Sequence, residues 1–309
     1  REGQGTGTPI FHGADGPGRR GDAYEAVLGK IERCIGGKNH TMIPKVIHYC
    51  WFGGGQKSEL IEACIQSWRK WCPDWEIVEW NERNWDVNYN LYTKEAYRER
   101  KWAFVSDVAR LDIIHKQGGI YLDTDVELLA SLDAHRQKAW AAFESVISIA
   151  TGLGFGAEQG NPAVEAMLEA YSGRSFYKGR GALKGCPYYN TKSLQSRYAK
   201  LVLDGTTQDL GDILILSHND YSYFARHHSA ASWTDTPQEK MGMPYIYHDS
   251  AVKRYLREPK RLAWIEAHLG ETAYHIYCFL AYDLLEHGGI WFCKKGIKKA
   301  KNMIWRSNE

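Results

Sequence analysis

The sequence lacks the features that mark several large classes of protein. Its 39 Lys and Arg against 37 Asp and Glu leave a formal net charge of only +2, a field too weak to hold a nucleic-acid backbone by bulk charge. No uncharged apolar run approaches the roughly 20 residues of a membrane span, and the first residues lack the pattern of a signal peptide. With 44% apolar and 25% charged residues, the composition is that of a soluble globular protein.

The seven cysteines also form no recognisable framework. Their number is odd, no two of them are spaced C-x-x-C, and their gaps match neither a zinc site nor a disulfide scaffold. This favours a reducing compartment, and we expect the protein in the cytoplasm. Aromatic residues, in contrast, are abundant at 13%. Aromatic rings with a polar handle suit a core, but they also suit sites that stack on sugars and nucleobases.

The composition divides the chain into three parts. Residues 1–41 hold ten of the 30 glycines, which indicates a flexible leader with one short helix at Ala23–Ile35. Residues 42–249 are expected to form the compact catalytic domain. Residues 250–309 are helical in pattern and end in a basic segment, so we expect a C-terminal helical extension with helices at 251–269, 272–287 and 294–306.

The first half of the compact domain alternates between strand and helix patterns. This rhythm predicts an α/β sandwich with a mostly parallel sheet, in which ligands bind beyond the carboxyl ends of the strands. The expected elements are strands at Lys45–Trp51, Glu76–Trp80 and Ile120–Leu122, resumed at Val126–Leu129, and helices at Ile61–Trp68 and Lys101–Gln117. Further along, we expect a helix at Asn190–Val202 and a strand at Asp212–Ser217.

Two carboxylates, Asp123 and Asp125, directly follow the short strand that begins at Ile120. Leaving a strand end at i and i+2, they can present oxygens to one hard divalent cation, and Mg²⁺ or Mn²⁺ held this way keeps positions open for phosphate oxygens. The alternative is a pair of solvated carboxylates in a loop. The glycines and the strand before them favour the metal site.

Asp107 and Arg110 stand at i and i+3 on the helix before that strand. They form either a surface ion pair or a binding pair, in which Asp107 accepts from a sugar hydroxyl and Arg110 donates to hydroxyl or phosphate oxygens. The spacing alone does not separate the two.

A third group of polar residues lies at 227–233. An imidazole from His227 or His228 could join the metal, and Ser232 or the indole of Trp233 could donate to a phosphate oxygen; solvated histidines are the alternative. Trp51, after the first strand, could stack on a base or a sugar, or lie in the core.

Taken together, these residues resemble glycosyltransferase family 32, the DXD-containing sugar transferases of bacterial polysaccharide synthesis and fungal mannan initiation. The large glucosylating bacterial toxins are similar at a greater distance. The matching blocks run from residue 42 to 233 and are IPKVIHYCWFGG (Ile43–Gly54), SWRKWCPDWEIVEWNE (Ser67–Glu82), KWAFVSDVARLDIIHKQGGIYLDTDVE (Lys101–Glu127), TGLGFGA (Thr151–Ala157) and HHSAASW (His227–Trp233).

The resemblance implies a GT-A-type, Rossmann-like α/β/α sandwich, a nucleotide-sugar donor, a divalent metal (Mn²⁺ or Mg²⁺) and retention of anomeric configuration. The implied roles follow the motif positions. Asp125 would bind the metal, and Asp123 would bind the ribose or the metal. His228 would be a further metal ligand, with His227 as its alternative. Asp107 and Arg110 would hold the donor sugar, Trp51 and Tyr121 would line the nucleotide pocket, and Ser232 and Trp233 would lie near the diphosphate.

We therefore expect a hexosyltransferase that acts on a glycan or a lipid-linked oligosaccharide in polysaccharide or capsule synthesis. The alternatives are a protein-modifying transferase of the toxin or effector type, and a non-catalytic carbohydrate-binding protein with a degenerate site. The basic segment near Lys294–Glu309 either rests on the inner face of an anionic membrane or is a solvated helix.

Overall fold

The computed structural model describes residues 41–177 and 185–228, together with residues 22, 24–29, 31 and 33. By compactness the chain divides into residues 1–38 and 39–309. The described residues of the first unit are helical, as predicted for this segment. The helices expected after residue 250 lie outside the described residues.

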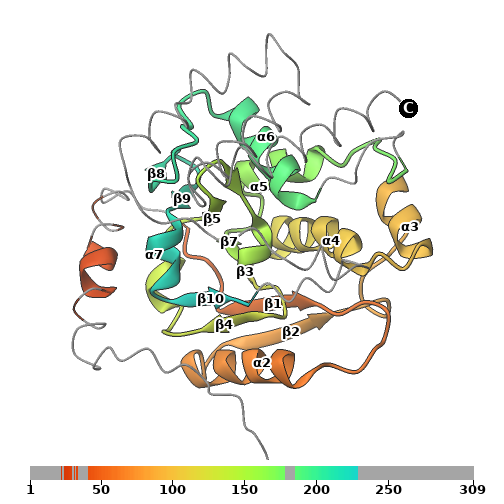
Figure 1. Ribbon diagram of the computed structural model, residues 1–309, viewed down its shortest axis with the longest axis horizontal. Helices are drawn as coiled ribbons and strands as arrows, with labels where there is room; N and C mark the ends of the chain where they lie inside the picture. The colour runs from red at the N-terminus through yellow and green to blue at the C-terminus, as the bar shows by residue number, and fades with distance from the viewer. Residues whose placement is uncertain are drawn as a thin grey trace, which may run out of the picture. The chain divides into compact units, whose positions relative to one another are not determined.

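A mixed sheet of eight strands forms the centre of the second unit (Figure 1). Its order is β2-β1-β3-β7-β5-β9-β8, with β6 paired to β5. The pairings give β2, β1, β3, β5 and β9 one direction, and β7, β8 and β6 the other. The strands are β1 (Val46–Cys50), β2 (Glu76–Trp80), β3 (Gly119–Tyr121), β5 (Trp140–Ser145), β6 (Ser148–Ile149), β7 (Phe155–Ala157), β8 (Gln208–Asp209) and β9 (Leu214–Leu216).

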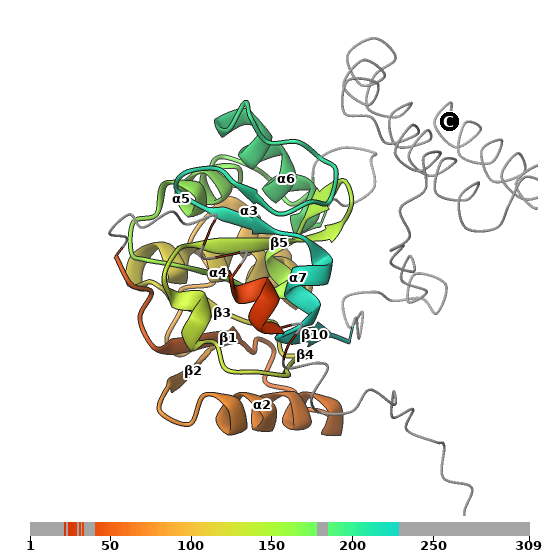
Figure 2. The ribbon, with the colours of Figure 1, turned by 90° about the vertical axis from the view of Figure 1, so that its left-hand side faces the viewer.

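Helices lie on both sides of this sheet (Figures 1 and 2). One side is taken by α2 (Glu59–Trp71) and the other by α4, α5 and α6, which confirms the predicted α/β sandwich with a mostly parallel sheet and is consistent with a GT-A-like fold. The helices are α2, α3 (Leu91–Arg98), α4 (Trp102–Gln117), α5 (Pro162–Glu169), α6 (Cys186–Arg197) and α7 (His218–Ser222), with short 3₁₀ turns η1 (Asp133–Arg136) and η2 (Thr151–Leu153).

The helix α4 carries two of the expected site residues and is buried over most of its length. Val105, Val108 and Leu111 have no exposed surface, and burying such a side chain contributes about 1.5–3 kcal/mol. The helix ends at Gly118, which has φ +68° and lies so close to Gln159 that a Cβ would meet its backbone nitrogen at 2.9 Å. Glycine is therefore required where the chain turns from α4 into β3.

Three local expectations are corrected. The helix expected at Asn190–Val202 instead spans Cys186–Arg197, because Pro187 in its first turn suits a helix start. The polar segment before α4 forms a helix that the pattern did not predict, α3, which begins at Asn90 with a capping box. Residues Val126–Leu128 form β4 but do not resume β3; they pair with β10 (Ala225–His227) in a separate two-stranded sheet.

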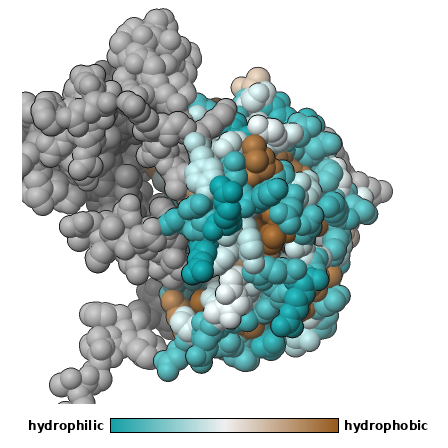
Figure 3. Space-filling view, turned by 90° about the vertical axis from the view of Figure 1, so that its right-hand side faces the viewer, coloured by the Kyte–Doolittle hydropathy of each residue, from teal (hydrophilic) through white to brown (hydrophobic). Residues whose placement is uncertain are grey.

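The described surface is mostly hydrophilic on the face shown in Figure 3, with apolar residues scattered over it. Among the described residues, Leu91 and Tyr89 are examples of large apolar side chains that are exposed, and some exposed apolar surface is ordinary for a globular protein. Within 41–177 and 185–228, no helix combines the length and the apolar character needed to cross a membrane.

Candidate active site

The segment with the two carboxylates is held in place at both ends by backbone contacts. The amide of Leu122 donates to the carbonyl of His48 at 3.0 Å, and that of Val126 donates to the carbonyl of Asp123, also at 3.0 Å. On the far side, α2 secures β4, because the Trp68 indole N–H donates to the carbonyl of Val126 at 2.7 Å. Asp123 and Asp125 therefore project from a short, fixed turn at the carboxyl end of β3, as the sequence predicts.

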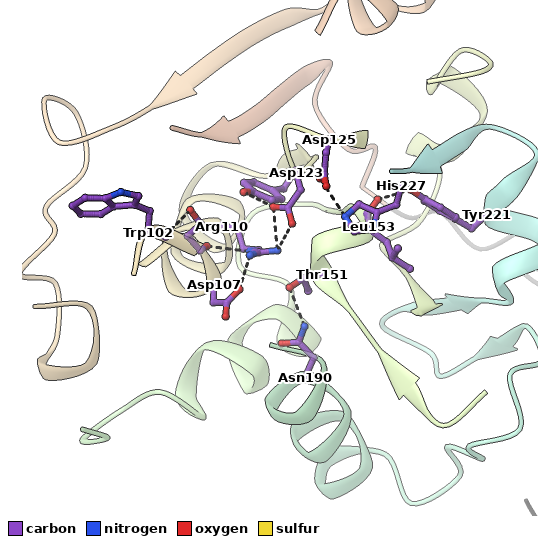
Figure 4. A network of polar contacts seen from close by, with 12 residues as sticks. Trp102, Asp107, Arg110, Asp123, Asp125, Thr151, Leu153, Asn190, Tyr221 and His227 are labelled. Carbon is purple, nitrogen blue, oxygen red and sulfur yellow. Dashed lines mark hydrogen bonds and ion pairs between the residues drawn. The ribbon is translucent and has the colours of Figure 1, made fainter. Parts of the chain in front are cut away.

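This turn brings its two carboxylates together with one imidazole. Asp123, Asp125 and His227 each offer a ligand atom, and the three atoms all lie within 4.8 Å of one another. Nε2 of His227 lies 3.2 Å from Oδ1 of Asp125, and Figure 4 marks this contact with a dashed line. All three residues are only half-buried, so an ion can reach them. Two carboxylates with one imidazole form a donor set that can hold a divalent cation.

The histidine in this group is His227, not His228. The predicted ligand His228 lies on the other face of the β4–β10 ribbon, with Nε2 3.1 Å from Oε2 of Glu127. The reason is the twofold alternation of side chains along a strand: β10 pairs with β4 so that His227 faces the same side as the fully buried Val126.

A network of polar contacts extends from Asp123 into the protein (Figure 4). The guanidinium of Arg110 donates to Asp107 at 2.5 Å, to Asp123 at 3.3 Å and to the carbonyl of Ser106 at 3.0 Å. The hydroxyl of Tyr121 donates to Oδ1 of Asp123 at 2.9 Å, and the Tyr121 ring lies under the guanidinium, 5.1 Å from its centre. Asp107 and Arg110 are thus a buried pair next to the carboxylates, and not an ion pair on a solvated surface.

Burial dominates the electrostatics of this network. It raises the pKa of Asp107 to about 6, against the opposing effect of Arg110, and it raises the pKa of Asp123 although Arg110 again opposes it. Burial alone would lower the pKa of His227, but hydrogen bonding and charge from Asp125 raise it above the ordinary value of 6.5. With three carboxylates around one permanent cation, the site carries excess negative charge that a divalent ion would offset.

The other predicted residues are divided by the structure. Tyr121 belongs to the network. Trp51 does not: its indole N–H donates to the carbonyl of Gly55 at 2.7 Å, and the ammonium of Lys57 lies 5.3 Å from its ring centre. It follows β1, the neighbour of β3, at the same edge of the sheet. Ser232 and Trp233 lie outside the described residues.

Three residues that the sequence analysis did not select also take part. Glu144, near the end of β5, is close enough to His227 and Asp123 to affect them electrostatically, and burial raises its pKa. Gly152 packs against the carboxylate of Asp123 and the guanidinium of Arg110. Cys186, the first residue of α6, donates to Asp107 from its backbone N–H and its thiol. Glu144 could have been found from the sequence as a polar residue that ends a buried strand, and Gly152 from the Thr151–Ala157 motif. No sequence feature identifies Cys186 as a site residue.

Comparison with known proteins finds a family match over the segment that carries the two carboxylates. Residues 58–146 match the family model for the glycosyltransferase sugar-binding region containing the DXD motif. Among solved structures, the chain is similar to one described as PaToxG Glycosyltransferase, with a TM-score of 0.43 and 17% identity over 59% of this chain and 80% of that one. No curated protein matches. The matched segment includes Asp107, Arg110, Asp123 and Asp125, and the chain therefore carries a glycosyltransferase-type sugar-binding region with its DXD motif at residues 123–125.

Proposed function

We propose that this protein is a metal-dependent, retaining hexosyltransferase of the family 32 type. It moves a sugar from a nucleotide-sugar donor to a glycan or lipid-linked oligosaccharide during polysaccharide synthesis, in the cytoplasm or at the inner face of the membrane. The observation that carries the proposal is the grouping of Asp123, Asp125 and His227 within 4.8 Å of one another at a strand end, with both carboxylates inside the segment 58–146 that matches the sugar-binding region.

The residues fit a divalent cation such as Mn²⁺ or Mg²⁺. Asp123, Asp125 and His227 would hold it, since carboxylate oxygens suit both ions and a neutral imidazole nitrogen can complete the ligand set. All three residues are half-buried, which leaves the ion accessible to the donor. When bound, the ion supplies Lewis-acid stabilisation of the negative charge that develops on the departing diphosphate.

The buried pair on α4 positions the sugar. Arg110 is held by Ser106, Asp107 and Asp123 at once, so its guanidinium is already oriented when the donor arrives and needs no reorganisation. Asp107 accepts hydrogen bonds and can take one from a sugar hydroxyl in addition to those from Arg110 and Cys186. This preorganisation favours hydroxyl recognition over simple charge attraction.

Retention of configuration follows from attack on the face from which the nucleotide departs. In this proposal the acceptor hydroxyl attacks that face, and the departing phosphate takes its proton. Trp51 and Tyr121 line the nucleotide pocket, and Ser232 and Trp233 contact the diphosphate. A glycosyl-enzyme intermediate isolated by mass spectrometry would count against this mechanism, and Glu144 is the carboxylate to inspect first.

The decisive experiment is nucleotide release from a panel of nucleotide sugars in the presence of Mn²⁺. Slow hydrolysis of one donor, abolished by EDTA and by Asp125→Ala, would support the proposal and identify the donor. Glu169→Gln serves as the control, because it removes one carboxylate from the exposed face of α5. If the unchanged chain releases no nucleotide from any donor, with or without glycan acceptors, the proposed function is wrong.

A further inference from the structure

The two-stranded ribbon of β4 and β10 has two different faces. Its inner face holds Val126 and His227, which are paired, and the pair Leu128 and Ala225; three of these four residues have at most 1% of their surface exposed. The outer face carries Glu127, paired with Arg226. The next residue, His228, follows on the outer face, because side chains alternate along a strand.

Both adjacent histidines are tied to the same aspartate. The imidazole of His227 contacts the carboxylate of Asp125 at 3.2 Å, while the backbone amide of His228 donates to the carbonyl of Asp125 at 3.0 Å. His228 is therefore next to Asp125 already, and only the direction of its side chain keeps its imidazole away from the metal group. A local bulge at the end of β10 would exchange the two side chains.

The carboxylate of Glu127 contacts two other side chains on the outer face. Oε2 of Glu127 lies 3.1 Å from Nε2 of His228 and 3.4 Å from Nη1 of Arg226. Only three residues of each strand are paired, so few backbone hydrogen bonds fix the register of β10 against β4. The last pair of the ribbon contains His227. The contacts of Glu127 with Arg226 and His228 therefore act at the end of β10, where the backbone determines which histidine side chain faces the metal group.

We propose that Glu127 is a positioning residue that selects His227 over His228 for the metal group. It acts through His228 and Arg226, by holding the imidazole of His228 on the outer face. The inference rests on the proposed function for the nature of the bound ion, but it concerns metal binding alone and is tested without turnover.

The test is the Mn²⁺ affinity of the full chain, measured by calorimetry and by electron paramagnetic resonance. In the unchanged background, His227→Ala weakens binding by more than about tenfold, and His228→Ala changes it by less than about threefold. The double variant Glu127→Ala with His227→Ala binds Mn²⁺ at least about fivefold more tightly than His227→Ala alone, because the released His228 replaces the missing ligand. Adding His228→Ala removes this gain.

The matched control is Glu127→Gln, which removes the same charge but keeps an oxygen that accepts from His228 and Arg226. Combined with His227→Ala, it restores no affinity. Glu76→Ala, an exposed strand glutamate on β2, controls for general effects, and circular dichroism checks that each variant is folded.

Two outcomes would overturn the proposal. One is a double variant, Glu127→Ala with His227→Ala, that binds no more tightly than His227→Ala. The other is an unchanged background in which His228→Ala costs as much affinity as His227→Ala, a comparison that does not touch Glu127 and holds even if its alanine variant does not fold. Failure of the proposed function has a different signature, since the unchanged chain would then release no nucleotide from any donor whatever its affinity for Mn²⁺.

Discussion

Nε2 of His227 lies 3.2 Å from Oδ1 of Asp125, and this contact links β10 to the turn after β3. It has an electrostatic consequence. Burial alone would lower the pKa of the imidazole, yet the hydrogen bond and the charge of Asp125 raise it above 6.5. A proton on this imidazole therefore competes with a cation that would bind at the same place.

Metal binding should therefore compete with a proton on His227. Because the pKa of this imidazole is raised, the Mn²⁺ affinity should increase with pH above 6.5, until the pH exceeds the raised pKa. Calorimetry from pH 6 to pH 8.5, in buffers of different ionisation enthalpy, measures both the affinity and the released proton. His227→Gln should bind more weakly and without proton release in this range. Equal pH dependence in the two proteins would show that His227 does not meet the metal.

Arg110 should not tolerate replacement by lysine. Its three contacts, to Ser106, Asp107 and Asp123, use three different nitrogens of the planar guanidinium, and one ammonium cannot reproduce them. Arg110→Lys leaves a buried carboxylate without its partner, so we expect a loss of about 3 kcal/mol in the free energy of unfolding, measured with urea. The exposed Arg83→Lys should change it by less than about 0.5 kcal/mol. A loss as small as in that control would mean that the network contributes little to stability.

The sequence predicts the parts of this protein that depend on local pattern. The apolar run at Val46–Cys50 and the glycine stop at Gly118 indicate β1 and the end of α4, and strand order then places Asp123 and Asp125 at the sheet edge. The identity of the third metal-group residue could not be predicted. It depends on which residue of β10 lies opposite Val126, a long-range pairing that no local pattern records.

The burial of the Asp107–Arg110 pair could not be predicted from the sequence either. An i, i+3 spacing is just as typical of a solvated ion pair, and what buries this one comes from distant segments. Gly152 covers the guanidinium from the η2 turn, and the start of α6 at Cys186 contributes two donors to Asp107. The sequence pattern predicts helix α6 at Asn190–Val202, whereas it begins at Cys186. Cys186 therefore could not be assigned to the site from the sequence.

Asp107 should make the stability of the protein fall between pH 4 and pH 7. Its pKa rises from 3.8 to about 6 on folding, so the folded state holds the proton more tightly than the unfolded state. That contribution is fully present below pH 3.8 and is lost as the pH rises through about 6. The loss amounts to about 3 kcal/mol by linkage.

Asp107→Asn lacks this titration, so the difference in unfolding free energy between the two proteins should change by that amount between pH 4 and pH 7. Any weakening of the contact with Arg110 adds an offset that does not vary with pH in this range. Urea unfolding at several pH values measures the difference, and parallel curves for the two proteins would contradict the prediction.

A substitution at Gly152 should impair metal binding while the protein still folds. A Cβ at this position would lie 2.8 Å from Oδ2 of Asp123 and 3.3 Å from Nη1 of Arg110, while the backbone there is not in the left-handed region that requires glycine. Gly152→Ala should therefore fold, at a cost of about 1–3 kcal/mol for overpacking, but displace the Asp123 carboxylate from Tyr121 and Arg110. We expect Mn²⁺ affinity to fall by about tenfold or more. Gly55→Ala is the matched control, because its φ is also outside the left-handed region and no atom lies within 4 Å of its Cβ. If both alanine variants bind Mn²⁺ as the unchanged chain does, Asp123 is not a ligand, and the carboxylate set must be reassigned to Asp125 and its neighbours.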